Sequence, residues 1–323
     1  CVRCTTPLLE KTRKKISMFT NVTVDDVFSC HDAKSIFMIP QMLYEQGLVD
    51  VVFKKFAKVG YTNTSKNWDN WNVIVSSLQK TDDTIKIAMI GKYVTLADSY
   101  VSVNEALKHA SASIGRSVNI DWIDSETLNG NLKQLDNFDG VLVPGGFGTR
   151  GSEGIIDTAT YALEKNIPYL GICFGFQLAA VAFGRKMCNL ENANSTEIVA
   201  DTKNPIIDLL PEQKDETDMG GSLRLGANEI KINQDSLAHK IYSSDKIFKR
   251  HRHRYEFNTK YREEFLKKGM IFSGESDDEK RMEILEVPSH KFFLGVQFHP
   301  EFNSRPGFPE DAFKTFVTVA SQN

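Results

Sequence analysis

The amino-acid sequence predicts an α/β fold with a mostly parallel central sheet and helices on both of its faces. Between residues 85 and 186, short apolar segments alternate with amphipathic ones, the pattern of strands joined by crossover helices. The 323-residue chain has room for about two domains, and its 41% hydrophobic and 25% charged residues are ordinary for a soluble globular protein. No apolar run reaches the ~18 residues of a membrane helix, and a net charge of −3 argues against nucleic-acid binding.

The first part of the chain, residues 1–58, reads as helices and short strands without a complete fold. It contains "AKSIFMIPQMLYEQGL", which is expected to be a helix interrupted at Pro40. Residues 59–83 place polar, turn-rich stretches on either side of "WNVIVSSL" and are predicted to be an interdomain linker. Residues 84–323 form the second domain. The chain begins with Cys rather than Met, so we expect it to be part of a longer protein.

The second domain opens with strands and helices in alternation. "IKIAMIGKY" is a buried strand, and "DSYVSVNEALKHASASIG" is an amphipathic helix that ends near Gly115. "SVNIDWID" and "FDGVLVPGG" are the second and third strands, "GIIDTATYALEKN" is a helix, and "IPYLGI" is the fourth strand. Ligands of such sheets bind at the carboxyl ends of the strands, so a functional site is expected there.

Three unusual stretches lie at predicted strand ends. "VLVPGGFG" ends a strand in Pro144-Gly145-Gly146, "YLGIC" ends one in Cys173, and "FFLGVQFHPE" ends one in His299-Pro300-Glu301. If the three strands are parallel, these ends meet at one edge of the sheet.

Cys173 stands at the turn between a strand and a helix, with Gly171 and Gly175 on either side. A nucleophile on such a tight turn needs small neighbours two residues away, as in the G-x-[nucleophile]-x-G elbow. The N-terminus of the following helix favours the thiolate through its amides and dipole. The alternative is a buried structural cysteine between packing glycines.

His299 and Glu301 supply the partners that a thiolate nucleophile needs. Pro300 restricts His299 to extended backbone angles, and Glu301 can accept a hydrogen bond from the imidazole. The result is a nucleophile, a base and an orienting acid in the order Cys, His, Glu. Taken alone, His-Pro-Glu is more often an ordinary strand end.

The glycines of "PGGFG" can expose backbone N–H groups to the oxyanion of a tetrahedral intermediate. One donor is expected from the turn at Gly145 and Gly146, and a second from Phe174, directly after the nucleophile. A simple turn is the alternative for this motif.

"GICFGFQ" and "FHPE" resemble the class I (triad) glutamine amidotransferases, which hydrolyse glutamine to release ammonia. The stretches "PGGFGTRGSEG", "ENANSTE", "DMGGSLRLG", "RHRHRYEFN" and "QFHPEFNSRP" narrow the resemblance to the CTP synthase family over 85–323. "KKISMF" and "SIFMIPQMLYEQGL" resemble the end of that family's N-terminal synthetase domain. The resemblance implies a flavodoxin-like glutaminase domain whose catalytic triad is Cys173, His299 and Glu301.

The resemblance also assigns further site residues. Those for glutamine are Gly146, Phe174, Gly175, Phe176, Gln177, Glu197 and Arg254. Glu197 suits the ammonium and Arg254 the carboxylate of the free amino acid. Phe147, Arg150 and Glu153 are expected in a lid that responds to GTP, and Lys15 at a nucleotide contact. The family commonly has Leu and Met where this chain has Phe174 and Phe176, and we expect the larger rings to reshape the pocket.

In the family, the ammonia aminates UTP that ATP has phosphorylated, with Mg²⁺, and GTP is an allosteric activator. This chain has no G-x-x-x-x-G-K-[ST] phosphate loop, so it is not expected to make CTP alone. The implied partners are L-glutamine, the N-terminal synthetase domain with its UTP and ATP, and other copies in a homotetramer that in some members forms filaments.

The sequence carries no strong metal signal. Cys1 and Cys4 form a C-x-x-C pair without a second pair at zinc spacing, and His251 and His253 have no ligand at helpful spacing. No metal is therefore expected. The odd count of five cysteines indicates a reducing compartment, so a cytoplasmic protein is expected.

Other interpretations stay open at this level. The elbow could belong to a glutaminase that serves another synthetase, or to a peptidase-like hydrolase of related fold. The domain could also be mainly a regulatory or assembly module.

Overall fold

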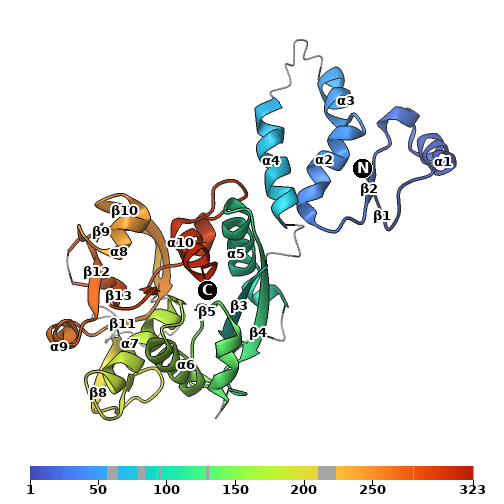
Figure 1. Cartoon of the computed structure of the whole chain (residues 1–323). Coiled ribbons are helices and arrows are strands. Elements are labelled where there is room, and N and C mark those ends of the chain that lie inside the picture. The colour runs from blue at the N-terminus through green and yellow to red at the C-terminus, as the bar shows by residue number, and fades with distance from the viewer. Residues whose placement is uncertain are drawn as a thin grey trace. The chain divides into compact units, whose positions relative to one another are not determined.

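A computed structural model describes residues 1–56, 65–78, 84–92, 94, 97–128, 131–209, 223–278 and 280–322. The chain divides into two compact units, Cys1–Ser76 and Ser77–Asn323 (Figure 1). Much of the predicted linker, 59–64 and 79–83, lies outside the described residues, and the rest of it forms a helix. Within the described part of the chain, no helix has the length and apolar character needed to cross a membrane.

The first unit is small and mainly helical. Trp71 Nε1 donates a hydrogen bond to the carbonyl oxygen of Phe37 at 2.8 Å, which ties the last helix of the unit to its middle. Pro40 does not interrupt a helix, as the sequence had suggested, but lies in the first turn of one, where its missing N–H costs nothing. The elements of this unit are β1 (Val2–Cys4), α1 (Glu10–Thr20), β2 (Ser29–His31), α2 (Ile39–Glu45), α3 (Leu48–Lys55) and α4 (Ser65–Leu78).

The second unit contains a nine-stranded mixed sheet in the order β10-β9-β12-β13-β14-β6-β5-β3-β4. Strands β14, β6, β5, β3 and β4 are parallel to one another, and the remaining neighbours pair antiparallel. The parallel strands are β3 (Thr84–Gly91), β4 (Ser117–Asp124), β5 (Gly140–Val143), β6 (Tyr169–Ile172) and β14 (Phe293–Val296). The others are β9 (Arg224–Ile232), β10 (Lys246–His253), β12 (Ile271–Ser276) and β13 (Met282–Glu286).

The predicted α/β class is confirmed; the sheet is mixed, with its five parallel strands continued by four strands that pair antiparallel. The connections after β12 and β13 are too short for a crossover helix, and strands joined so closely must pair antiparallel. In the parallel part, β3, β5 and β6 are each followed by a long helix.

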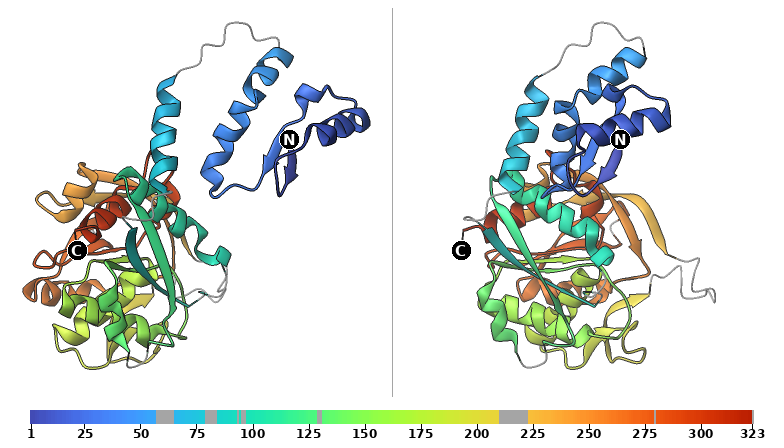
Figure 2. Two further views of the ribbon diagram at one scale, coloured as in Figure 1. Left: turned by 45° about the vertical axis from the view of Figure 1, so that its right-hand side comes forward. Right: turned by 90° about the vertical axis from the view of Figure 1, so that its right-hand side faces the viewer.

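Helices cover both faces of this sheet. Along β3, Ile87 and Met89 face the core beneath α5 and α10, whereas Ala88 and Ile90 face the core beneath α6 and α7 (Figures 1 and 2). The helices are α5 (Val101–Ser113), α6 (Ser152–Lys165), α7 (Phe174–Lys186), α8 (Leu237–Tyr242), α9 (Arg262–Lys267) and α10 (Asp311–Ala320). A second, three-stranded sheet is made of β7 (Ala193–Ser195), β8 (Asn204–Leu209) and β11 (Tyr255–Phe257).

The carboxyl ends of β5, β6 and β14 lie side by side. In the ladders, Val143 of β5 faces Gly171 of β6, and Ile172 of β6 faces Val296 of β14. The loop at 144–148, Cys173 and the segment at 297–301 therefore leave the sheet at one edge, as the sequence predicts.

Candidate active site

Cys173 occupies a strained turn between β6 and α7. Its backbone angles, φ 51° and ψ −97°, are unusual for a residue with a side chain. Its N–H donates to the carbonyl oxygen of Val296 at 2.7 Å, which fixes the turn to the end of β14. A Cβ on Gly175 would lie 2.3 Å from the carbonyl oxygen of Val143, and one on Gly171 would lie 2.7 Å from the backbone of Gly175. Close backbone approach therefore requires both glycines, as in a nucleophile elbow.

His299 and Glu301 form a hydrogen-bonded pair beside Cys173. Nδ1 of His299 donates to Oε1 of Glu301 at 2.8 Å, and Glu301 lies in a short 3₁₀ helix over Pro300–Asn303. The N–H of His299 donates to the carbonyl oxygen of Arg250 at 2.8 Å. Both side chains are largely buried. The opposite ring nitrogen, Nε2, makes no hydrogen bond of ordinary geometry to any residue in the described part of the chain.

The environment of His299 favours the imidazolium. Burial acts to lower the pKa of His299, but the neighbouring Cys173 and the Glu301 carboxylate outweigh it and raise the pKa to about 10. A protonated imidazole that lies between Cys173 and a carboxylate stabilises a negative charge on the sulfur. This is the arrangement expected for a thiolate–imidazolium pair.

A cavity of about 760 Å³ opens over this pair. It brings together most of the residues that the sequence singles out, because the three strand ends and the segment at 252–255 all border it. Those residues are Gly145, Gly146, Phe147, Cys173, Gln177, Glu197, Arg254 and His299. The cavity also includes residues that the sequence did not point to, namely Ser99, Tyr100, Leu223, Arg252, His253 and Tyr255.

Three residues of the predicted glutamine set do not line this cavity. Phe174 and Phe176 are 1% and 0% exposed and belong to the hydrophobic core under α7. Gly175 packs against Val143. The larger ring of Phe176 therefore affects the packing of the core and not the cavity wall. Phe174 lies nearer to the glycine loop, because a Cβ added to Gly146 would lie 3.6 Å from the Phe174 ring.

Lys92, at the end of β3, holds the glycine loop from one side. It is 5% exposed, and its Nζ donates to the carbonyl oxygen of Phe147 at 2.9 Å and to that of Gly148. The ammonium lies 4.2 Å from the centre of the Phe174 ring, a cation–π contact. Burial lowers the pKa of Lys92 to about 8, although the charge of Glu197 opposes this effect. In the sequence, Lys92 is only a lysine directly after a buried apolar strand, a position that does not by itself indicate this role.

Glu197 holds the same loop from the other side. Its Oε1 accepts the N–H of Gly148 at 2.7 Å. Burial raises the pKa of Glu197, while the Gly148 amide and Lys92 act in the opposite direction. The loop that carries Gly145 and Gly146 is thus fastened by one cationic and one acidic side chain.

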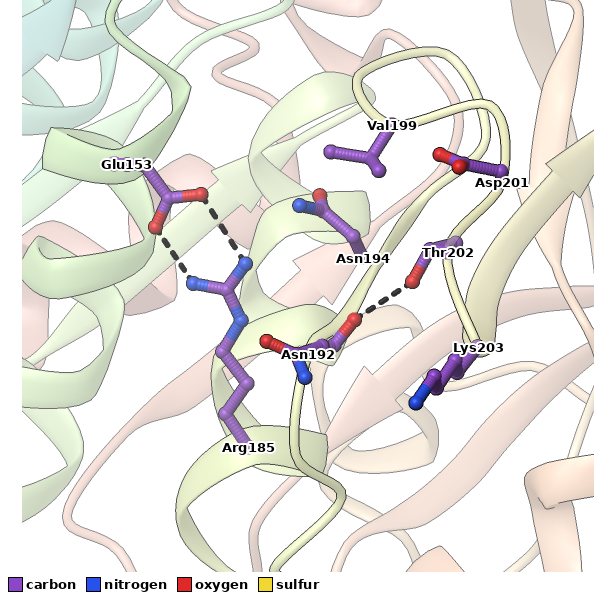
Figure 3. A pocket seen from close by; sticks show the side chains of 8 residues that line it. All are labelled: Glu153, Arg185, Asn192, Asn194, Val199, Asp201, Thr202 and Lys203. Atoms are coloured by element: carbon purple, nitrogen blue, oxygen red, sulfur yellow. Dashed lines mark hydrogen bonds and ion pairs between the residues drawn. The ribbon is translucent and has the colours of Figure 1, made fainter.

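The predicted lid residues lie in different surroundings. Phe147 borders the cavity and is 67% exposed. Arg150 pairs with Glu126 at 2.9 Å and also donates to the carbonyl oxygen of Lys92. Glu153 instead faces a second cavity of about 590 Å³, where both of its carboxylate oxygens accept hydrogen bonds from Arg185, at 2.6 and 3.1 Å (Figure 3). Lys15 is an exposed residue of α1, in the first unit.

The two histidines of "RHRHR" belong to a buried network. His251 Nε2 lies 2.9 Å from an oxygen of Glu283, whose other oxygen pairs with Arg224. His253 donates from Nδ1 to the carbonyl oxygen of Tyr255 at 3.0 Å. Burial lowers the pKa of His253 to about 3, so the ring is neutral. Since Arg224 already neutralises Glu283, a divalent cation here would face an uncompensated guanidinium, and the expectation that no metal binds remains a prediction.

Comparisons with known proteins agree with these features. The family model described as "Glutamine amidotransferase class-I" matches residues 95–319, and the one described as "CTP synthase N-terminus" matches residues 1–58. The CTP synthase of Thermococcus kodakarensis is 45% identical over 318 residues, which are 98% of this chain and 59% of that protein. The CTP synthase of Staphylococcus haemolyticus is 45% identical over 321 residues, 99% of this chain and 60% of that protein. This chain thus spans about three-fifths of the length of these relatives.

A solved structure is similar as well. The glutaminase domain of the Trypanosoma brucei CTPS, with bound acivicin, superimposes with a TM-score of 0.70 at 37% sequence identity, covering 74% of this chain and 94% of that chain. Family match, sequence identity and fold therefore agree that this chain belongs to the class I glutamine amidotransferases and, among them, to the CTP synthases.

Proposed function

We propose that this chain hydrolyses glutamine to glutamate and ammonia at Cys173. The observation that carries the proposal is the meeting of a cysteine on a nucleophile elbow with a His299–Glu301 pair in one cavity of about 760 Å³. A thiol beside an imidazole that is oriented by a carboxylate is the arrangement of nucleophilic amide hydrolysis.

The thiolate of Cys173 attacks the side-chain amide carbon of glutamine, and a C–S bond forms. His299 gives its Nε2 proton to the amide nitrogen, which leaves as ammonia when the C–N bond breaks. The neutral ring then takes a proton from water, whose oxygen attacks the γ-glutamyl thioester. The C–S bond breaks, glutamate leaves, and the thiolate–imidazolium pair is restored. Glu301 keeps Nδ1 protonated throughout, which leaves Nε2 to exchange protons.

The backbone N–H groups of the Gly145–Gly146 turn and of Phe174 stabilise the tetrahedral oxyanion. The turn is close to the reacting groups, since a Cβ on Gly145 would lie 2.8 Å from Cε1 of His299 and 3.7 Å from the Cβ of Cys173. Lys92 and Glu197 restrain this loop, so its donors need little reorganisation during the reaction.

The charged ends of glutamine are matched by Glu197 for the ammonium and Arg254 for the carboxylate, because both border the cavity that contains Cys173. Gln177 borders it too, and Gly146, Phe174 and Gly175 contribute through their backbones.

In the complete enzyme the ammonia serves to aminate UTP to CTP at the expense of ATP, with Mg²⁺ present. This sequence contains no phosphate-binding loop of the G-x-x-x-x-G-K-[ST] type, and the chain spans about three-fifths of its curated relatives, so we assign that step mainly to the rest of the complete enzyme. Lys15 would contact nucleotide there. GTP, the proposed activator, would have to compete with the Glu126 and Glu153 ion pairs to reach Arg150 and Glu153. We also propose that the complete enzyme is cytoplasmic and assembles as a homotetramer.

The test uses 6-diazo-5-oxonorleucine, a glutamine analogue that alkylates a nucleophile inside a formed glutamine pocket. Intact mass and peptide mapping should show one adduct on Cys173, and excess glutamine should prevent it. The Cys173→Ala variant serves as the control and should stay unlabelled. If the unchanged chain neither forms this adduct nor releases glutamate from glutamine, the proposal for this chain is wrong.

A further inference from the structure

Two buried glutamines connect Cys173 to the backbone of β11. Gln177, on α7, is 3% exposed, and Gln297, just after β14, is 1% exposed. Nε2 of Gln177 lies 2.8 Å from the carbonyl oxygen of Tyr255 and 3.3 Å from Oε1 of Gln297. Nε2 of Gln297 in turn lies 3.7 Å from Sγ of Cys173, within hydrogen-bond range of a sulfur atom.

The order of donors and acceptors in this chain is fixed by its far end. The carbonyl oxygen of Tyr255 can only accept, so Gln177 must turn its NH₂ group toward it. The same NH₂ group meets Gln297, which must therefore present its oxygen. Gln297 is left with its own NH₂ group toward the sulfur. A flip of either amide would bring two donors or two acceptors together.

We infer that Gln297 is a catalytic residue that donates a hydrogen bond to Cys173 and stabilises its thiolate, and that Gln177 is the positioning residue that holds Gln297 in this orientation. A hydrogen bond to the charged form of a group favours that form, most strongly where the donor is buried. The inference deepens the glutaminase proposal and rests on it for its significance, because thiolate formation precedes attack on the amide.

The other neighbours of the sulfur make such a donor necessary. The carbonyl oxygen of Arg252 lies 3.8 Å from Sγ and can accept a hydrogen bond from a thiol, but it repels a thiolate. His299 attracts the thiolate until it gives its proton to the leaving ammonia. Gln297 keeps its amide protons throughout the reaction, so its hydrogen bond is available to the sulfur both before the attack and when the thioester releases the thiolate.

The experiment measures the alkylation of Cys173 in the full 323-residue chain by iodoacetamide, which needs no glutamine pocket. Rates are followed from pH 5 to 10 by peptide mapping, and the exposed Cys1 serves as an internal standard. Gln297→Met keeps the length of the side chain without its donor. The midpoint of its profile should lie about one pH unit higher, so that alkylation at pH values below the midpoint is about tenfold slower, and Cys1 should be unchanged.

The charged and titratable groups around the cavity, which also shape this profile, stay the same in these variants. They are His299, His253, Tyr100, Tyr255, Glu197, Arg252 and Arg254. Gln297→Glu places a carboxylate at the same position and should move the midpoint upward by at least as much as Gln297→Met.

Gln177→Met provides a second test in case the Gln297 variants do not fold. It leaves Gln297 beside the sulfur and removes the hydrogen bond from Gln177 that orients the Gln297 amide. Its midpoint should move in the same direction by a smaller amount. Near-UV circular dichroism shows which variants are folded. A folded Gln297→Met or Gln177→Met chain whose Cys173 profile matches that of the unchanged chain would overturn the inference.

The alkylation readout is independent of glutamine hydrolysis. If the unchanged chain does not hydrolyse glutamine but Gln297→Met still shifts the profile, the donor role holds and the proposed function fails. If glutamine is hydrolysed, Gln297→Met should lower kcat about tenfold with KM changed less than twofold, since glutamine does not need the sulfur contact to bind.

Discussion

Cys173 and Glu301 favour the protonated form of His299 in the folded chain. Part of the stability of the domain therefore depends on pH. The pKa of His299 in the folded chain is raised from 6.5 to about 10 against the effect of burial. For a base with a raised pKa, the stabilising contribution is complete below the ordinary value of 6.5 and is lost as pH rises through about 10.

Glu301→Gln should therefore destabilise the domain most at neutral and mildly acidic pH. The substitution keeps the size of the side chain and removes the charge that favours the imidazolium. We expect a loss of about 2 kcal/mol in the free energy of unfolding at pH 7, shrinking as pH approaches 10. Urea denaturation at pH 6.5, 8 and 9.5 measures the difference, and a difference that stays constant with pH would contradict this account.

The geometry of the elbow between β6 and α7 depends on the absence of a side chain at one position, Gly175. Gly175 stands in the first turn of α7, where its backbone touches β5, and Gly184 stands in the last part of the same helix. A Cβ on Gly184 would meet only side-chain atoms, at 3.3 Å or more.

Gly175→Ala should cost about 3 kcal/mol of stability and should displace Cys173, because its Cβ would lie 2.3 Å from a backbone oxygen. Gly184→Ala is the matched control and should stay within about 1 kcal/mol of the unchanged chain, since alanine also favours the helix. Thermal unfolding and labelling of Cys173 by 6-diazo-5-oxonorleucine compare the two. Equal effects would mean that close approach at the elbow does not determine the geometry of the site.

At the scale of the whole molecule, the proposed glutamine hydrolysis would be the first half of a two-step process, and we expect the two halves to be separable. In a complete enzyme of this family, Cys173→Ala should abolish CTP formation from glutamine and leave CTP formation from added ammonium within about twofold of normal, because only the supply of ammonia is lost. Nucleotide analysis with each nitrogen source measures both rates. Loss of the ammonium-driven rate as well would show that this position also supports the structure.

Most of the parallel half of the sheet could be predicted from the sequence, because its strands and helices alternate with clear periodicity. The antiparallel half could not, since short buried strands such as β12 and β13 give the same apolar pattern whichever way they run. At the site, local motifs indicated Cys173 and His299. Gln297 and Lys92 were missed because each is recognised only by what it contacts: a sulfur from the neighbouring strand in one case, and two loop carbonyls in the other.

The bond from the Cys173 N–H to the carbonyl oxygen of Val296 has a consequence for how such a site can be controlled. It makes the nucleophile and the base the ends of two hydrogen-bonded strands, so their spacing is set by the pitch of a sheet and is as rigid as the core. The glycine loop, in contrast, is held by hydrogen bonds from two side chains, those of Lys92 and Glu197. A signal that turns hydrolysis on or off can therefore act on the loop at a small cost in free energy, while Cys173 and His299 keep their positions.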